Sequence, residues 1–196
     1  MVTSVEADGR PVSEARQRIL DTAYELFSHR GVRAVGVDEL IERAGVAKAT
    51  FYRHFPSKDE LVLAFLMQRE QLWTHGWVEA QARERGASPE EQLLVIFDLF
   101  GEWFANDDFE GCSFINVLLE IGDRQHPVGR ASTAALENIR SVIRTLAKEA
   151  GLRDPEEFAL SWHILMKGSI VQAAEGDLKA AKRAQTMGRL LIDYYR

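Results

Sequence analysis

Several features that mark other classes of protein are scarce in this sequence. Its 196 residues include a single cysteine, Cys112, which excludes an internal disulfide and fits a reducing cytoplasm; a small buried hydrophobe is the ordinary role for it and a reactive thiol the alternative. No apolar run approaches the roughly 18 residues that a membrane helix requires. Residues 1–12 lack the apolar segment of a signal peptide and predict a short disordered arm. We therefore expect a cytoplasmic protein that does not contact membranes.

Motifs that carry catalysis are also missing. The sequence has no phosphate-binding glycine loop, no nucleophile elbow and no His or Cys cluster with metal-ligand spacing. An acidic trio, Asp107, Asp108 and Glu110, follows the end of an aromatic helix and is typical of a solvated loop. The sequence therefore predicts neither an enzyme nor a bound metal or cofactor.

Positive charge is scarce overall but unevenly distributed. The net charge is −6, yet residues 1–58 sum to +1 and the remainder to −7. A DNA-binding module needs local cations that displace phosphate counterions, and an acidic body stays away from the duplex. This distribution permits DNA binding at the N-terminal end and does not demonstrate it.

What the sequence has in abundance is helix signal. Apolar residues recur at helical spacing, and serine or aspartate followed by acids marks helix starts at Ser57, Ser88 and Asp154. No alternating strand pattern or repeat competes, so we predict an all-α fold of about nine helices. The expected helices span roughly residues 14–30, 37–44, 48–54, 57–85, 89–106, 112–121, 128–150, 156–175 and 178–195.

Residues 37–54 carry the most informative pattern. Two short helices joined by a tight turn at Gly45 are typical of a helix-turn-helix, whose second helix enters the major groove of DNA. The side chains left outside its small core are Lys48, Ala49, Thr50, Tyr52, Arg53 and His54. They suit phosphates and base edges. The alternative is a helical hairpin whose polar face is merely solvated.

The run VDELIERAGVAKATFYRHFPSKDEL over residues 37–61 closely resembles the signature of the TetR family of transcriptional regulators. The resemblance extends back through residues 23–31 and covers about the first third of the chain. Two positions depart from it, because Gly36 stands where the family commonly has Thr or Ser, and Ala47 where it has Ser. Each change removes a side-chain helix cap, so we expect altered DNA affinity and not lost function.

The resemblance implies a helix-turn-helix domain over residues 13–58 and an effector-binding and dimerisation domain over residues 59–196. Backbone amides at Gly36 and Val37 would meet phosphate at a helix N-terminus. The side chains expected against the DNA backbone are Lys48, Tyr52, His54 and Lys58. Those expected at base edges are Ala49, Thr50 and Arg53. Arg10 or Arg16 would enter a flanking minor groove.

The middle of the chain is rich in aromatic residues, a composition that fits a largely apolar ligand pocket. For any single aromatic residue, simple core packing is the alternative. The resemblance favours a pocket for a small apolar or amphipathic effector of unknown identity. The residues expected to line it are Trp73, Trp77, Phe100, Trp103, Phe104, Phe114, Asn116, His163 and Met166.

The segment 156–175 is apolar on nearly all sides, which indicates burial on more than one face. A second subunit explains the extra face, and with the last helix this predicts a two-fold four-helix interface. The alternative is that the chain's own long helices cover it. The expected interface residues are Trp162, Ile170, Val171, Ala174, Ala184 and Leu191.

Together these patterns predict a homodimeric regulator that binds a palindromic DNA operator, most readily as a repressor, and releases it when the effector binds. The alternative is a DNA-binding adaptor that answers to a protein partner and has no small-molecule effector. A deep apolar cavity in the body favours the first hypothesis, and a filled core favours the second.

Overall fold

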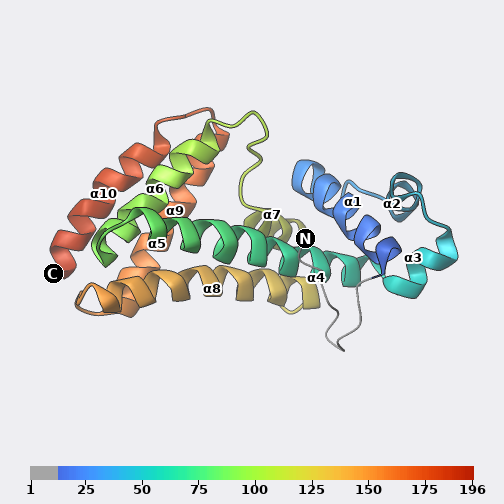
Figure 1. Cartoon of the computed structure of the whole chain (residues 1–196), viewed down its shortest axis with the longest axis horizontal. Helices are drawn as coiled ribbons and strands as arrows, with labels where there is room; N and C mark the ends of the chain where they lie inside the picture. Colours follow the sequence, from blue (N-terminus) through green and yellow to red (C-terminus); the bar gives the residue numbers. More distant parts are fainter. Residues whose placement is uncertain (1–12) are drawn as a thin grey trace.

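The computed structural model describes residues 13–196 and is all-helical over that range (Figure 1). The expected N-terminal arm, with Arg10, lies outside the described residues. The helices are α1 (Glu14–Arg30), α2 (Val37–Ala44), α3 (Lys48–His54), α4 (Lys58–Arg69), η1 (Glu70–Glu79), α5 (Ala80–Arg85), α6 (Pro89–Phe104), α7 (Ser113–Ile121), α8 (Pro127–Glu149), α9 (Pro155–Ala174) and α10 (Ala180–Tyr195). Because α4, η1 and α5 run on as one rod, residues 13–196 form nine separate helices, and the predicted fold class is confirmed.

The helices begin where local side chains satisfy their first amides. The Ser57 hydroxyl accepts a hydrogen bond from the Glu60 amide at 3.2 Å, and the Ser88 hydroxyl accepts one from the Glu91 amide at 3.3 Å. Asp154 caps α9 in the same way. Such bonds stabilise a helix start by about 1 kcal/mol, which explains why these boundaries were readable from the sequence.

The rod contains one feature that the sequence pattern did not predict. Its middle ten residues, η1, form a π-helix in place of the expected uninterrupted α-helix. A π-helix has i→i+5 hydrogen bonds and usually occupies a single turn, often at a functional site. The spacing of apolar residues over a long segment is dominated by its α-helical parts. The α-helical period of α4 and α5 therefore gave no sign of the π-helix between them.

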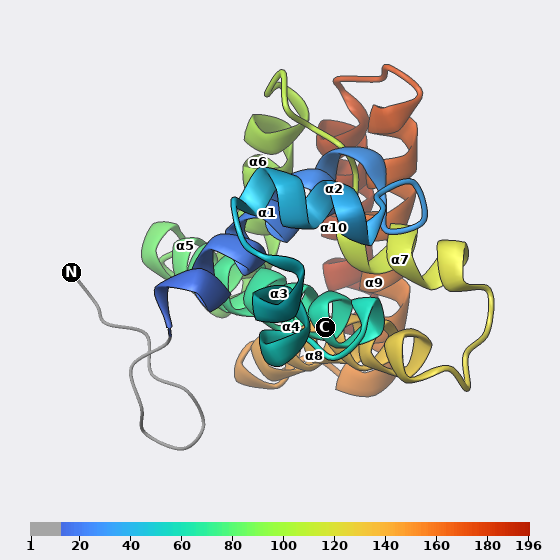
Figure 2. The ribbon, with the colours of Figure 1, turned by 90° about the vertical axis from the view of Figure 1, so that its right-hand side faces the viewer.

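The three N-terminal helices pack together at one end of the molecule, and α9 and α10 lie at the other (Figure 1). The rod runs between them alongside α8, and α7 packs mainly on α8, to one side of α4 (Figure 2). At the start of the rod, the Phe65 ring contacts the rings of Tyr24 and Phe27 on α1, with centroids 5.6 and 5.5 Å apart. The hydrophobic core therefore continues from α1 into the body.

Cys112 lies in the core just before α7, and burial raises the pKa of its thiol. This placement agrees with the role of a small buried hydrophobe. None of the helices from α1 to α10 combines the length and the apolar character needed to cross a membrane.

Candidate functional site

The turn between α2 and α3 is made by Gly45 in the left-handed region, at φ 62° and ψ 42°. Its amide donates to the Glu42 carbonyl, and the Val46 amide donates to the Ile41 carbonyl at 3.2 Å. A residue with a Cβ is strained at this φ, whereas glycine adopts it freely, so the turn can be tight. Helix α2 therefore ends and α3 begins with only residues 45–47 between them.

Helix α3 keeps one side in the core and turns the other outward. Phe51 and the following Phe55 are buried against the N-terminal helices. Lys48, Ala49, Tyr52 and Arg53 are exposed, and Thr50 and His54 are half-buried. This is the division that the sequence pattern predicted.

The lysine at the start of α3 is held only loosely. Lys48 Nζ lies 3.6 Å from the Asp38 carboxylate, and both side chains are mostly exposed. An ion pair of this kind contributes little in water, so a phosphate can replace the carboxylate at low cost. Neither helix start, at Gly36 or at Ala47, has a side-chain cap.

Three of the expected DNA contacts, His54, Lys58 and Arg16, have closer interactions within the protein. His54 Nε2 shares a hydrogen bond of 3.2 Å with the Ser13 hydroxyl, which caps α1. Lys58 is half-buried, and burial lowers the pKa of its ammonium group against the opposing effect of Glu120 and Asp59. The Arg16 guanidinium lies 4.9 Å over the Phe55 ring. These side chains are positioned by the protein itself.

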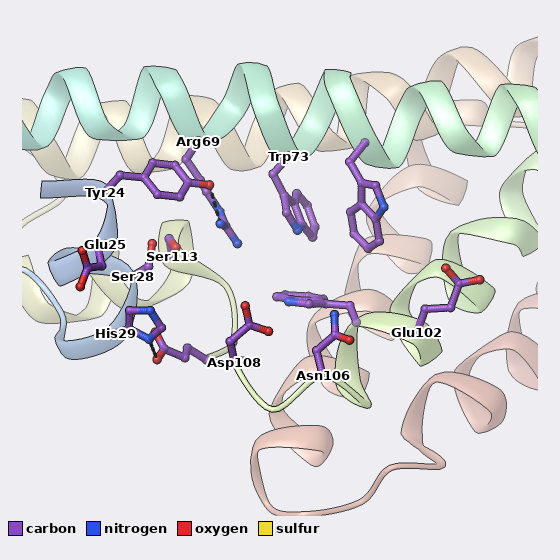
Figure 3. Close-up of a pocket in the computed structure, with 14 residues that line it drawn as sticks. Tyr24, Glu25, Ser28, His29, Arg69, Trp73, Glu102, Asn106, Asp108 and Ser113 are labelled. Carbon is purple, nitrogen blue, oxygen red and sulfur yellow. Dashed lines mark hydrogen bonds and ion pairs between the residues drawn. The ribbon is translucent and has the colours of Figure 1, made fainter. Parts of the chain in front are cut away.

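A cavity of about 470 Å³ lies where α1, the rod, the end of α6 and the loop before α7 meet (Figure 3). Its walls therefore come from both the N-terminal helices and the body. The lining residues are Tyr24, Glu25, Ser28, His29, Arg69, Trp73, Trp77, Glu102, Trp103, Asn106, Asp108, Glu110, Gly111 and Ser113.

Three indoles form one wall of this cavity. The ring centroids of Trp73 and Trp103 are 5.2 Å apart, and those of Trp77 and Trp103 are 6.5 Å apart. Trp73 and Trp77 come from η1, so the π-helical segment supplies two of the three rings. Perpendicular and tilted pairs of this kind are favourable arrangements for aromatic rings.

The cavity only partly matches the pocket expected from the sequence. Trp73, Trp77 and Trp103 do line it. The other expected lining residues do not: Phe100, Phe104, Phe114, His163 and Met166 are buried in the core, and Asn116 is exposed. Their aromatic and apolar side chains fill the space between helices, which is the core alternative weighed above.

The lining residues that sequence reasoning missed come mainly from α1 and from the segment between α6 and α7. Tyr24, Ser28 and His29 line the cavity, although their helix was assigned to the DNA-binding unit alone. Arg69, at the end of α4, was missed as well. No local pattern marks these residues, because the packing of α1 against the rod creates the cavity.

Polar contacts join the N-terminal helices to the body beside this cavity. The Arg33 amide, in the loop after α1, donates to the Glu120 carboxylate of α7 at 2.7 Å. His29 of α1 contacts Glu110 in the loop before α7, whereas the 3.3 Å contact between His126 Nε2 and the Asp59 carboxylate lies within the body, between α4 and the start of α8. Helix α7 is thus tied to the loop that leads into the helix-turn-helix.

The outer face of α9 and α10 is apolar and uncovered. Ile164 and Tyr194 are each 70% exposed and Leu190 is 60% exposed. A hollow of about 340 Å³ runs between the two helices. It is lined by Ser161, Ile164, Leu165, Met187, Leu190, Leu191 and Tyr194.

This face differs in detail from the interface expected from the sequence. Val171 and Ala174 are exposed and Leu191 is partly exposed. Trp162, however, is fully buried, because its indole stacks on Phe158 at 5.2 Å inside the protomer. Ile170 and Ala184 are buried as well. Helix α9 is apolar both on the face that packs in the core and on the outer face. The spacing of its apolar residues therefore did not indicate which of them would be buried and which exposed.

Comparisons with known proteins agree with this geometry. The profile of the bacterial regulatory proteins of the tetR family matches residues 19–65. The transcriptional activator FasR of Mycolicibacterium smegmatis is 48% identical over 97 residues, which are 50% of this chain and 43% of FasR. The chain thus spans less than half of FasR. The transcriptional regulator AcuR of Cereibacter sphaeroides is 26% identical over 84% of this chain and 81% of its own.

The similarity also extends over the whole fold. The crystal structure of SCO4454, a TetR-family transcriptional regulator from Streptomyces coelicolor, superposes with a TM-score of 0.84 at 27% identity, covering 93% of this chain and 96% of that one. The helix-turn-helix and the helical body define a DNA-binding transcriptional regulator. The N-terminal helices match the tetR family of bacterial regulatory proteins, and 93% of the chain shares the fold of a TetR-family transcriptional regulator.

Proposed function

We propose that this regulator is a homodimer that represses transcription from a palindromic operator and leaves the DNA when a small molecule fills the cavity beside α1. The observation that carries the proposal is the lining of that cavity, which combines Tyr24, Ser28 and His29 of α1 with the rod and α6. A ligand there touches the DNA-reading end directly. The proposed units are residues 13–58 for DNA binding and residues 59–196 for effector binding and dimerisation, in a cytoplasmic, non-enzymatic protein.

In the proposed DNA complex, α3 lies in the major groove. Ala49, Thr50 and Arg53 approach base edges, and Lys48, Tyr52 and His54 contact the DNA backbone. The exposure of Lys48, Tyr52 and Arg53 supports these roles. Gly36, Val37 and Lys58 meet phosphates at the ends of neighbouring helices, where backbone amides attract anions.

The proposed dimer joins the outer faces of α9 and α10 in two copies. Support comes from the exposed side chains of Ile164, Met187, Leu190 and Tyr194, which form a continuous apolar strip around the hollow. Exposed apolar patches of this kind mark protein interfaces. Of the interface residues expected from the sequence, Val171, Ala174 and Leu191 are accessible for this role.

The proposed release follows from linkage. A ligand in the cavity shifts α1 only if it binds the DNA-free arrangement more tightly than the DNA-bound one. Typical couplings are about 1–3 kcal/mol, or roughly 5- to 150-fold in affinity. The contacts of Glu120 with the Arg33 amide, and of His29 with Glu110, supply a path between cavity and helix-turn-helix. The filled aromatic core of the body favours the alternative, an adaptor that answers to a protein, whereas the cavity beside α1 favours a small-molecule effector.

Unbiased operator selection with the purified protein tests the DNA half of the proposal. We expect an inverted repeat whose half-sites are about 34–36 Å apart, because a two-fold dimer presents two copies of α3 one helical turn apart. Recovery of a single half-site would contradict the proposal that the protein binds DNA as a dimer. Placing the recovered site over a promoter then separates repression from activation, which is the role in the name of the transcriptional activator FasR.

Calorimetric titration of a cavity ligand, with and without operator DNA, tests the switch. We expect operator to lower ligand affinity by the same factor by which ligand lowers operator affinity. Equal ligand affinities in the two titrations would show that the cavity is not coupled to DNA binding.

A further inference from the structure

The charges around the cavity indicate what kind of molecule it accepts. We propose that it binds an aromatic carboxylate, whose anionic group lies against Arg69 and whose ring lies against the wall of three indoles. This inference rests on the proposed effector site and names its ligand class.

Arg69 has no anionic partner among residues 13–196. Its Nη1 donates to the Tyr24 hydroxyl at 2.7 Å, and no ion pair within residues 13–196 includes it. The guanidinium lies 5.6 Å from the Tyr24 ring and 6.0 Å from the Trp73 ring. A guanidinium has five N–H donors in a planar fork that fits a carboxylate. One donor is engaged, and the group points into the cavity (Figure 3).

Two buried donors in the lining, one on α1 and one on η1, also lack an acceptor. The Ser28 hydroxyl and the Trp73 indole N–H have no hydrogen-bond partner in the described part of the chain. A buried donor left unpaired costs about as much as a lost hydrogen bond, so an acceptor that reaches it is favourable. Because side-chain rotations are common when a ligand binds, we expect one or both groups to reach an anion held at Arg69.

The acids of the lining do not neutralise Arg69, because most have other partners. Glu25 pairs with Arg43 at 2.9 Å, and Glu102 pairs with Arg85 at 2.5 Å. Glu110 contacts His29, with one carboxylate oxygen left buried and unpaired.

Asp108 is the acid of this lining that has no partner among the described residues. It is exposed on the loop before α7 and lies across the cavity from Arg69 (Figure 3). Its charge acts against a ligand anion, although water at the exposed carboxylate weakens that effect. We expect Asp108 to limit the affinity and not to reverse the preference for an anion.

The indoles determine the rest of the ligand. Trp73, Trp77 and Trp103 offer flat apolar surfaces at mutual centroid distances of 5.2 to 6.5 Å. A planar ring packs on such a wall by offset or edge contacts. The faces of the indoles would also attract an organic cation, but the positive charge of Arg69 at the end of the wall repels one. Binding of an organic cation is therefore the test result that would oppose an aromatic carboxylate.

The test uses three probes of one shape: 2-naphthoate, 2-naphthamide and 2-naphthylmethylammonium. Their affinities for the full-length protein are measured by calorimetry at pH 7. We expect 2-naphthoate to bind at least tenfold more tightly than the amide, and the ammonium to bind most weakly. Equal binding of acid and amide, preference for the ammonium, or binding of none of the three overturns the inference.

Variants separate the charge of Arg69 from its packing. Arg69→Gln should lower 2-naphthoate affinity on the order of tenfold to a hundredfold and remove the preference over the amide, since a charged hydrogen-bond donor is lost. Arg69→Lys should retain a smaller preference. Tyr24→Phe is the matched control, because it breaks the same hydrogen bond and leaves the cation in place.

Asp108→Asn should raise 2-naphthoate affinity by a few-fold. An Arg69→Gln variant that folds normally and still prefers the acid overturns the inference.

This inference and the proposed switch fail in different ways. If 2-naphthoate binds through Arg69 but leaves operator affinity unchanged, the ligand class stands and the switch is wrong. If a neutral or cationic molecule binds the cavity and releases DNA, the switch stands and the ligand class is wrong.

Discussion

The two ends of the protomer leave surfaces of opposite chemistry uncovered (Figure 1). Helix α3 presents Lys48, Tyr52 and Arg53 to solvent, whereas α9 and α10 present Ile164, Leu190 and other apolar side chains. Cations and hydroxyls are well solvated when nothing covers them, but a contiguous apolar strip is not. The first surface is suited to a polyanion and the second to another apolar surface.

The middle of the molecule connects these ends and is neither strongly cationic nor apolar. The cavity beside α1 has indoles on one side and charged groups on the other. Substitutions can therefore alter one end, or the connection between the ends, and leave the others intact.

The largest effect is expected at the apolar end. Leu190→Glu places a charge in the proposed dimer interface, and an unpaired buried charge costs roughly 3–5 kcal/mol. Sedimentation at micromolar concentration should show a dimer for the original protein and a monomer for the variant. Leu119→Glu is the matched control, because Leu119 is 73% exposed on α7, away from this face. If the unsubstituted protein sediments as a monomer, the apolar face of α9 and α10 is not a dimer interface.

The connection between the ends depends on Gly31, which lies at φ 77° and ψ 165°. An added Cβ meets the Glu120 carboxylate, which would have to leave the Arg33 amide. With the strain of this backbone region, Gly31→Ala should cost about 2–3 kcal/mol of unfolding free energy. In a Glu120→Ala background the cost should fall by about 1 kcal/mol. Chemical denaturation of the four proteins measures this difference, and strict additivity would show that the contact contributes nothing.

A pH effect is expected from His163, beneath the outer face of α9. Burial, with smaller contributions from Lys167 and Arg140, lowers the pKa of this imidazole from 6.5 to about 3. Above pH 6.5 the folded and unfolded forms are both neutral, so the shift has no effect. As the pH falls from 6.5 towards 3, only the unfolded state gains the proton, and stability is lost.

At pH 5 this loss should be about 2 kcal/mol relative to pH 7, at 1.36 kcal/mol per pH unit below 6.5. His163→Leu should show correspondingly less acid destabilisation, because the other titrating groups are common to both proteins. Urea denaturation at the two pH values gives the comparison. Equal pH dependence in both proteins would mean that the imidazole is protonated in the folded state.

The smallest effects are expected at the cationic end. Lys48→Ala should weaken binding to all DNA sequences alike and reduce the slope of log affinity against log salt by about one unit. Arg53→Ala should change which bases are preferred and cost about 1–3 kcal/mol on the selected operator. Fluorescence anisotropy at several salt concentrations, on selected and scrambled sites, distinguishes a loss of phosphate contact from a loss of base contact. A changed base preference in Lys48→Ala would reverse the assigned roles.

The helix-turn-helix was largely predictable because its determinants are close together in the chain. The left-handed turn at Gly45 and the burial of Phe51 and Phe55 depend on residues within about one helical turn of each other. The cavity was not predictable in the same way. Trp73, Trp77 and Trp103 were identified as candidates, but Tyr24 and Arg69 reach the same cavity only because α1 packs on the rod.

Thus the sequence by itself determined the helix class, most helix boundaries and the outward side of α3. Caps such as Ser57, glycine turns and 3.6-residue spacing act over a few residues and need no distant partner. Only the tertiary structure decided that Trp162 is core while Ile164 is surface, and that the cavity includes α1. An apolar residue is buried or exposed according to which distant helix covers it, and that depends on packing across the whole molecule.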